Sequence, residues 1–102
     1  MNNDKEQQIQ IELTEDIAQG IYSNLAVISH SSSEFVVDFI RVVPGMPKAK
    51  VQSRIILTPE HAKRLMFALN DNIKKFEADF GPITINKQEG FIPPISGQMG
   101  EA

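Results

Sequence analysis

Hydrophobic and polar residues alternate in the first part of the chain, as in β-strands with one buried face. Ile9, Ile11 and Leu13 alternate with Gln10 and Glu12, which predicts a short half-buried strand. The next segment, residues 14–19, is expected to form one helical turn or a loop. The other predicted strands are residues 21–29, 35–43 and 49–57. Turn-forming residues separate the last three strands, so the pattern predicts an antiparallel four-stranded β-meander.

A regular stripe of apolar residues predicts one long amphipathic helix after the strands. Thr58-Pro59-Glu60 is typical of a helix start, and Gly81-Pro82 is typical of a helix end. The apolar residues recur three and four positions apart; they are Ala62, Met66, Leu69, Ile73, Phe76 and Phe80. We expect this stripe to pack on the sheet, which gives an α+β fold.

The turn around Pro44-Gly45-Met46-Pro47 predicts a strand register. If Pro44 and Lys48 face each other across an antiparallel hairpin, the numbers of paired residues add up to 92. Asp38 then lies opposite Arg54, as expected for opposite charges. The register also pairs Phe35 with Leu57, Val36 with Ile56, Val37 with Ile55, Ile40 with Gln52, and Arg41 with Val51.

Both faces of the central predicted strands are apolar, whereas one helix can cover only one face. Burying a further ~300–500 Å² of apolar surface is worth on the order of 7–12 kcal/mol before association costs. The expected interface residues are Val36, Asp38, Ile40, Val42, Arg54 and Ile56. We therefore expect a homodimer or homotetramer; the alternative is that the N-terminal strand and the C-terminal tail cover the second face.

Length and composition fit one small domain. The chain has 102 residues, a net charge of −3 and no cysteine, which agrees with a reducing compartment. We expect residues 1–7 and 82–102 to be tails and residues 8–81 to be the folded domain, a size that is marginal for a monomer. The chain shows no signal peptide and no membrane-spanning run, so a cytoplasmic protein is expected.

Candidate chemistry is sparse, and we expect no catalytic, cofactor-binding or metal-binding site. His30 lies in a serine-rich turn and His61 in the first helical turn, and neither belongs to a cluster of metal ligands or a catalytic triad. Asp38 is either an ion-pair partner of Arg54 or a buried acid with a shifted pKa. An enzyme centred on Asp38 or His30 is therefore the weakest hypothesis, and we expect the protein not to be an enzyme.

A basic strand face gives a second hypothesis. Lys48, Lys50 and Arg54 are expected to share the outer face of the last strand, where they could contact phosphates. Binding of single-stranded nucleic acid also needs aromatic stacking platforms. Tyr22 and Phe67 are the aromatic residues expected at the surface, so a solvated charged face is the simpler interpretation.

A set of short motifs runs through residues 24–81: Asn24, the Ser31–Ser33 turn with Glu34-Phe35, Asp38-Phe39, Pro44-Gly45, Arg54-Ile55, residues 59–65, residues 68–70, Phe76-Glu77 and Phe80-Gly81. With these motifs the chain resembles a family of short bacterial proteins of unknown function. This resemblance implies no activity and no site residues. In its order of elements the chain is also similar to the export chaperone SecB, which favours a homo-oligomeric module that binds protein or peptide.

Overall fold

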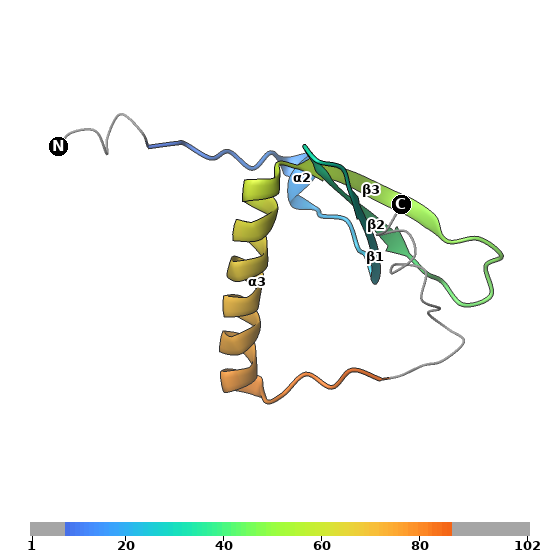
Figure 1. The fold of residues 1–102 in the computed structure, drawn as a ribbon. Coiled ribbons are helices and arrows are strands. Elements are labelled where there is room, and N and C mark those ends of the chain that lie inside the picture. Colours follow the sequence, from blue (N-terminus) through green and yellow to red (C-terminus); the bar gives the residue numbers. More distant parts are fainter. Residues whose placement is uncertain (1–7, 87–102) are drawn as a thin grey trace.

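A three-stranded antiparallel sheet is followed by one long helix in the computed structural model, which describes residues 8–86 (Figure 1). The elements are α2 Glu15–Ala18, β1 Leu25–His30, β2 Phe35–Arg41, β3 Lys50–Leu57 and α3 Pro59–Phe80. The strands lie in the order β1-β2-β3, as in a meander. The α+β class, the helical turn before the sheet and the long helix are confirmed.

The predicted N-terminal strand is not formed, so the expectation of four strands is wrong for the part of the chain that the structure describes. Residues 8–13, which we call the arm, run away from the sheet in an extended path (Figure 1). Ile9 and Ile11 are 82 % and 90 % exposed. The arm has the alternating pattern of a strand, but a strand also needs a hydrogen-bonded neighbour, and the arm has none among the described residues.

The predicted register of β2 and β3 is correct up to a β-bulge. The pairs from Phe35 with Leu57 to Phe39 with Ser53 are those expected, and Asp38 lies opposite Arg54. After the bulge, the pairs are Ile40 with Val51 and Arg41 with Lys50. The predicted pairing of Ile40 with Gln52 and of Arg41 with Val51 is therefore wrong, because one extra residue of β3 is accommodated there.

Side chains close both ends of the β1–β2 hairpin. The Asn24 amide donates to the Val42 carbonyl oxygen (3.1 Å), and its oxygen accepts from the Val42 N–H (2.8 Å). The Asn24 side chain therefore takes the place of a backbone partner for Val42, one residue beyond the end of β2. At the other end, the Ser31 hydroxyl accepts from the N–H groups of Ser33 and Glu34. Such local bonds favour a tight turn.

Helix α3 begins and ends where the sequence predicts. The Thr58 hydroxyl accepts from the His61 N–H at 3.2 Å, and Pro59 occupies the first turn. Gly81 has a φ of 98° and its N–H donates to the Glu77 carbonyl oxygen. A positive φ strains residues with a Cβ atom, so glycine fits this position.

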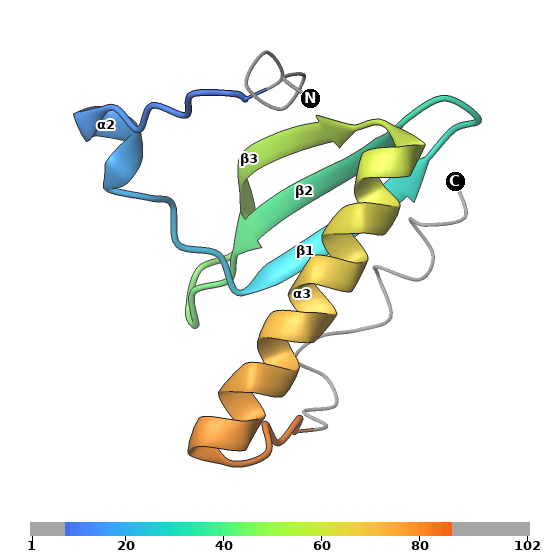
Figure 2. The same ribbon diagram turned by 90° about the vertical axis from the view of Figure 1, so that its left-hand side faces the viewer.

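Only the first turns of α3 lie beside the sheet, and the rest of the helix extends past it (Figures 1 and 2). The expected packing of the whole stripe on the sheet is not confirmed, and Phe76 and Phe80, expected in the core, are exposed. The buried apolar side chains of the described residues are Val27, Val37 and Ile40. Of the two expected tails, residues 82–86 have no regular structure, and the remainder lies outside the described residues.

Candidate functional site

An apolar groove separates the sheet from the first half of α3. Strand residues Ile28, Phe35, Val37 and Leu57 line one side, and the helix lines the other with Ala62, Leu65, Met66 and Leu69. We call this the inner groove; its volume is about 370 Å³. Every lining side chain is apolar, so no group in the groove can fix a polar ligand by hydrogen bonding. Its chemistry suits another apolar surface.

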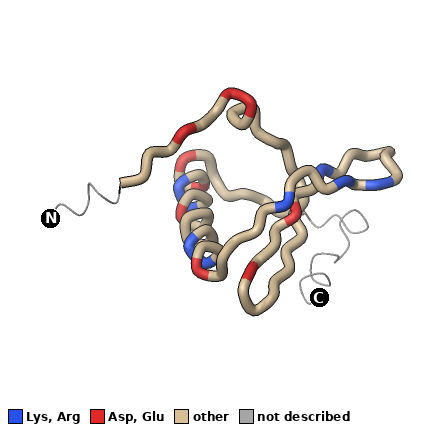
Figure 3. Tube along the Cα trace, turned by 90° about the horizontal axis from the view of Figure 1, so that it is seen from above, with Lys and Arg blue, Asp and Glu red and all other residues tan. Residues whose placement is uncertain are grey.

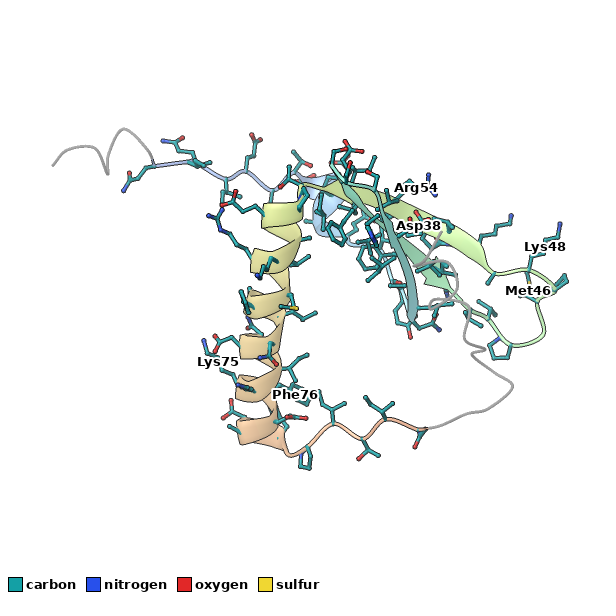
Figure 4. The ribbon with its side chains drawn as sticks, viewed as in Figure 1. Asp38, Met46, Lys48, Arg54, Lys75 and Phe76 are labelled. Atoms are coloured by element: carbon teal, nitrogen blue, oxygen red, sulfur yellow. The ribbon has the colours of Figure 1, made fainter. Side chains whose placement is uncertain are left out.

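The apolar stripe of α3 continues beyond the inner groove. Figure 4 shows Phe76 on the side of the helix that faces the sheet and Lys75 on the opposite side. Phe76 contacts Phe80, with ring centroids 4.9 Å apart. The two rings are nevertheless 48 % and 75 % exposed, because no strand reaches this part of the helix. The second half of α3 therefore presents an apolar surface to water.

The exposed area of this stripe approaches that of a stable interface. The five large side chains of the stripe and the flanking Leu65 are between 36 % and 75 % exposed; the five are Met66, Leu69, Ile73, Phe76 and Phe80. Since an aromatic side chain buries roughly 150–250 Å² and an aliphatic one less, up to about 500 Å² of apolar area is uncovered. A stable interface buries about 600–1,000 Å² on each partner. The stripe alone therefore supplies most of the area needed at the lower end of that range.

The same face of the sheet is hollowed at its other end. A cavity of about 680 Å³ is lined by Ile21, Ser23, Asn24, Leu25, Ala26, Phe39, Ser53 and Ile55. Phe39 and Ile55 share a face with Phe35, Val37 and Leu57, because side chains alternate along strands and paired residues share a face. Hollows therefore lie at both ends of the inner face, and Val37 between the ends is buried.

The interface residues expected from the sequence lie on the opposite, outer face of the sheet. Asp38 and Ile40 are buried there, Val36 and Val42 are half-buried, and Ile56 is exposed. The larger exposed apolar area lies on α3, because the strands expose only Ile28 and Ile55 on the inner face and Val51 and Ile56 on the outer face. The sequence pattern predicts that the sheet covers the helix stripe, and for this reason it does not reveal the exposed surface of α3.

Asp38 and Arg54 form a bidentate ion pair on the outer face. Arg54 Nε lies 2.6 Å from Asp38 Oδ1, and Arg54 Nη2 lies 2.9 Å from Asp38 Oδ2. The side chain of Asp38 is 12 % exposed and that of Arg54 is 63 % exposed. Hydrogen bonding to Arg54 lowers the pKa of Asp38 and outweighs the opposing effect of burial, and the same bonds raise the pKa of Arg54. Asp38 is therefore held ionised.

The predicted basic face is divided by the β-bulge. Lys50 pairs with Arg41 and so lies on the opposite face from Arg54, which pairs with Asp38. Lys48 and Lys50 instead surround a hollow of about 230 Å³ together with Arg41, and Lys and Arg gather at this hairpin (Figure 3). The guanidinium of Arg41 lies 5.6 Å from the ring centroid of Tyr22. Arg54 is therefore not a member of this basic group.

The histidines take part in local structure. The His30 ring stacks on Phe35 with centroids 5.3 Å apart, at the end of β1. Ser31, beside it, holds the turn through its hydroxyl oxygen. The backbone N–H of His61 donates to the Thr58 hydroxyl at the start of α3. Residues 8–86 contain no group of three His, Cys, Asp or Glu side chains arranged to hold a metal ion.

Comparison with known proteins identifies the family and little beyond it. No curated protein and no solved structure matches the chain, and nothing links it to SecB. Within residues 8–86, no helix has the length and apolar character needed to cross a membrane. The model of one family matches residues 1–85, and its description is protein of unknown function (DUF3467). Because this match covers most of the chain, the protein belongs to the DUF3467 family.

Proposed function

We propose that this protein is a homo-oligomeric interaction module, without enzymatic activity, that binds other polypeptides. Two or more copies assemble by covering the inner groove and the α3 stripe of one another. The observation that carries this proposal is the apolar surface of α3, which the sheet of the same copy leaves uncovered beyond Leu69. An amphipathic helix of 22 residues with one apolar face in water is an unusual feature for a stable monomer.

The free energy gained by burying this surface is large enough to offset the cost of association. Removing about 500 Å² of apolar area per copy from water contributes on the order of 12 kcal/mol. The loss of translational and rotational freedom opposes association by about 4–15 kcal/mol. Two copies that each bury this area therefore gain enough to associate. Residues of the inner sheet face, such as Ile28 and Ile55, add to the buried area because they are also exposed.

The kind of surface that is available supports the proposed binding of polypeptides. The cavity at the other end of the inner face, which the proposed self-association leaves free, is lined mainly by aliphatic and aromatic side chains, and it offers few groups for orienting a small polar molecule. The two edges of the sheet, β1 and β3, have no neighbouring strand in the described part of the chain. Open edges and apolar pockets are the features with which sheets bind extended peptides.

The alternative function is binding of single-stranded nucleic acid. The cluster of Arg41, Lys48 and Lys50 with Tyr22 nearby supports this alternative, because cationic and aromatic groups together bind single strands. The placement of Arg54 weakens it, since the charge of Arg54 is balanced by Asp38. The proposal therefore favours polypeptides.

The first test is the mass of the protein in solution at micromolar concentration. One chain has a mass of 11.4 kDa, and we expect light scattering or sedimentation to give at least twice this value. A mass of one chain at concentrations up to 100-fold higher would exclude the homo-oligomer.

The second test separates polypeptides from nucleic acid. We expect a permanently unfolded polypeptide, reduced and alkylated so that it cannot refold, to remain bound at high salt, because apolar contacts are not screened. Binding of an oligo-dT single strand that is salt-sensitive and absent in an Arg41/Lys48/Lys50→Ala variant would instead support the alternative function. Retention of neither probe would leave the polypeptide-binding part of the proposal without support.

A further inference from the structure

The arm has the sequence pattern of a strand but not the partner of one. Ile9, Ile11 and Leu13 alternate with polar residues, and all three are largely exposed in this copy. Thr14, which follows the arm, has the extended backbone angles φ −75° and ψ 161°. An extended segment with one apolar side is suited to pairing with the edge of a sheet.

Strand β3 offers a free edge whose side chains complement those of the arm. Ser53, Ile55 and Leu57 lie on its inner face, whereas Arg54 and Ile56 lie on its outer face. Strand β1, the other edge, carries no Lys, Arg, Asp or Glu between Leu25 and His30. The arm has one charged residue among residues 8–13, which is Glu12. Charge complementarity therefore favours β3 over β1.

Resting on the proposed homo-oligomer, we propose that the arm of one copy adds as a fourth, antiparallel strand to the β3 edge of a second copy. The register places Glu12 opposite Arg54. It then places Ile11 opposite Ile55 and Ile9 opposite Leu57.

In this register the apolar and polar sides of the arm match the inner and outer faces of β3. The apolar side of the arm meets the inner face of β3, and Glu12 meets the face that carries Arg54. The Arg54 side chain is 63 % exposed while its Nε and Nη2 atoms bind Asp38, so a second carboxylate can approach this side chain. A shift by one residue would place Ile9 and Ile11 on the charged outer side, so the pattern disfavours such a shift.

A second copy is the partner because the arm leads away from its own sheet. Helix α2 and the turn at Gly20, which has a φ of 79°, separate the arm from β1. The arm runs away from the sheet in Figure 1, and in the view of Figure 2 it passes above the β3 edge without pairing with it. In the proposed assembly, both the exposed arm and the open edge of β3 gain a partner.

Cysteine cross-linking tests the contact directly, because the natural chain contains no cysteine. We expect a mixture of the Gln10→Cys and Ile56→Cys variants to form a disulfide between the two variants under mild oxidation, because the register places these residues opposite each other. The matched control is a mixture of Gln10→Cys with Ser29→Cys. Ser29 and Ile56 both pair with Val36, one on each edge of the sheet.

A disulfide with the Ser29→Cys variant at equal or higher yield would overturn the proposal. So would a disulfide that forms only inside one chain of a Gln10→Cys/Ile56→Cys double variant, since that outcome assigns the arm to its own sheet.

Self-association gives an independent readout. We expect the Ile9→Ser/Ile11→Ser variant to have a dissociation constant at least tenfold higher than that of the wild type, because it loses buried apolar area. The control variant Gln8→Ser/Gln10→Ser loses no such area, and its dissociation constant should stay within about threefold of the wild-type value. If both arm variants assemble like the wild type and no cross-link forms, the arm contact is excluded while the homo-oligomer stands. If the wild type is a single chain, both proposals are excluded.

Discussion

Phe76 is the residue whose replacement best distinguishes an interface on α3 from a merely exposed helix. Its ring is 48 % exposed and touches Phe80 on the same helix. In a single copy, Phe76→Gln removes only this local contact, so the free energy of unfolding should fall by less than about 1 kcal/mol. Glutamine is a good helix former, and the helix itself is expected to persist.

In the proposed assembly, the same change has a larger effect. Full burial of a phenylalanine contributes roughly 1.5–3 kcal/mol, and about half of the ring is still available for burial. Each copy therefore loses about 0.8–1.5 kcal/mol at the interface, and two equivalent copies lose about twice that. We expect the dissociation constant to rise roughly tenfold to hundredfold.

The assay is sedimentation or light scattering over a range of protein concentrations. Lys75→Gln is the matched control, because it introduces the same residue at the neighbouring position, on the opposite side of the helix (Figure 4). Lys75 forms an exposed pair with Asp71 at 3.3 Å, and its loss should leave the mass unchanged. Equal dissociation constants for the two variants would refute the placement of the interface on the apolar face of α3.

Three further predictions concern the stability of the fold. Thr58→Ala should cost about 1 kcal/mol in denaturant unfolding because the helix loses its capping bond; Thr58→Ser should restore most of it. Asn24→Ala should cost about 1 kcal/mol because both backbone groups of Val42 lose their partner, and no loss would show that water replaces the amide. Asp38→Asn should lower the unfolding midpoint at neutral pH. Because Arg54 lowers the pKa of Asp38, the wild-type advantage should be complete above the ordinary aspartate pKa of 3.8 and disappear as the pH falls through the lowered value; an advantage that is unchanged by acid would contradict the assigned ion pair.

The sequence predicts best those features that depend on neighbouring residues. The start of α3 follows from Thr58-Pro59 and its end from Gly81, because capping is decided within one turn of the helix. The β2–β3 register follows from one hairpin and the pairing of Asp38 with Arg54. Beyond Phe39 the prediction is wrong, because alternation alone does not reveal where one extra residue is accommodated.

The sequence predicts less well those features that depend on what a segment packs against. The arm and the helix stripe both have the pattern of half-buried elements, yet Ile11 and Phe76 are exposed in one copy. Periodicity states which side of a segment is apolar, but it does not state which molecule covers that side. The sequence therefore predicts an interface on the outer face of the sheet, whereas the larger exposed apolar surface lies on α3.

These two exposed segments have one physical explanation in common. A chain of this size buries few apolar side chains on its own, and here Val27, Val37 and Ile40 are the buried ones among the described residues. The ordering of each backbone residue costs about 1–2 kcal/mol, which so small a core offsets poorly. Contacts between copies would supply the missing burial, since they would cover Phe76 and Ile11 at the same time. If they do, folding and assembly are coupled, and the midpoint of thermal unfolding should rise with protein concentration.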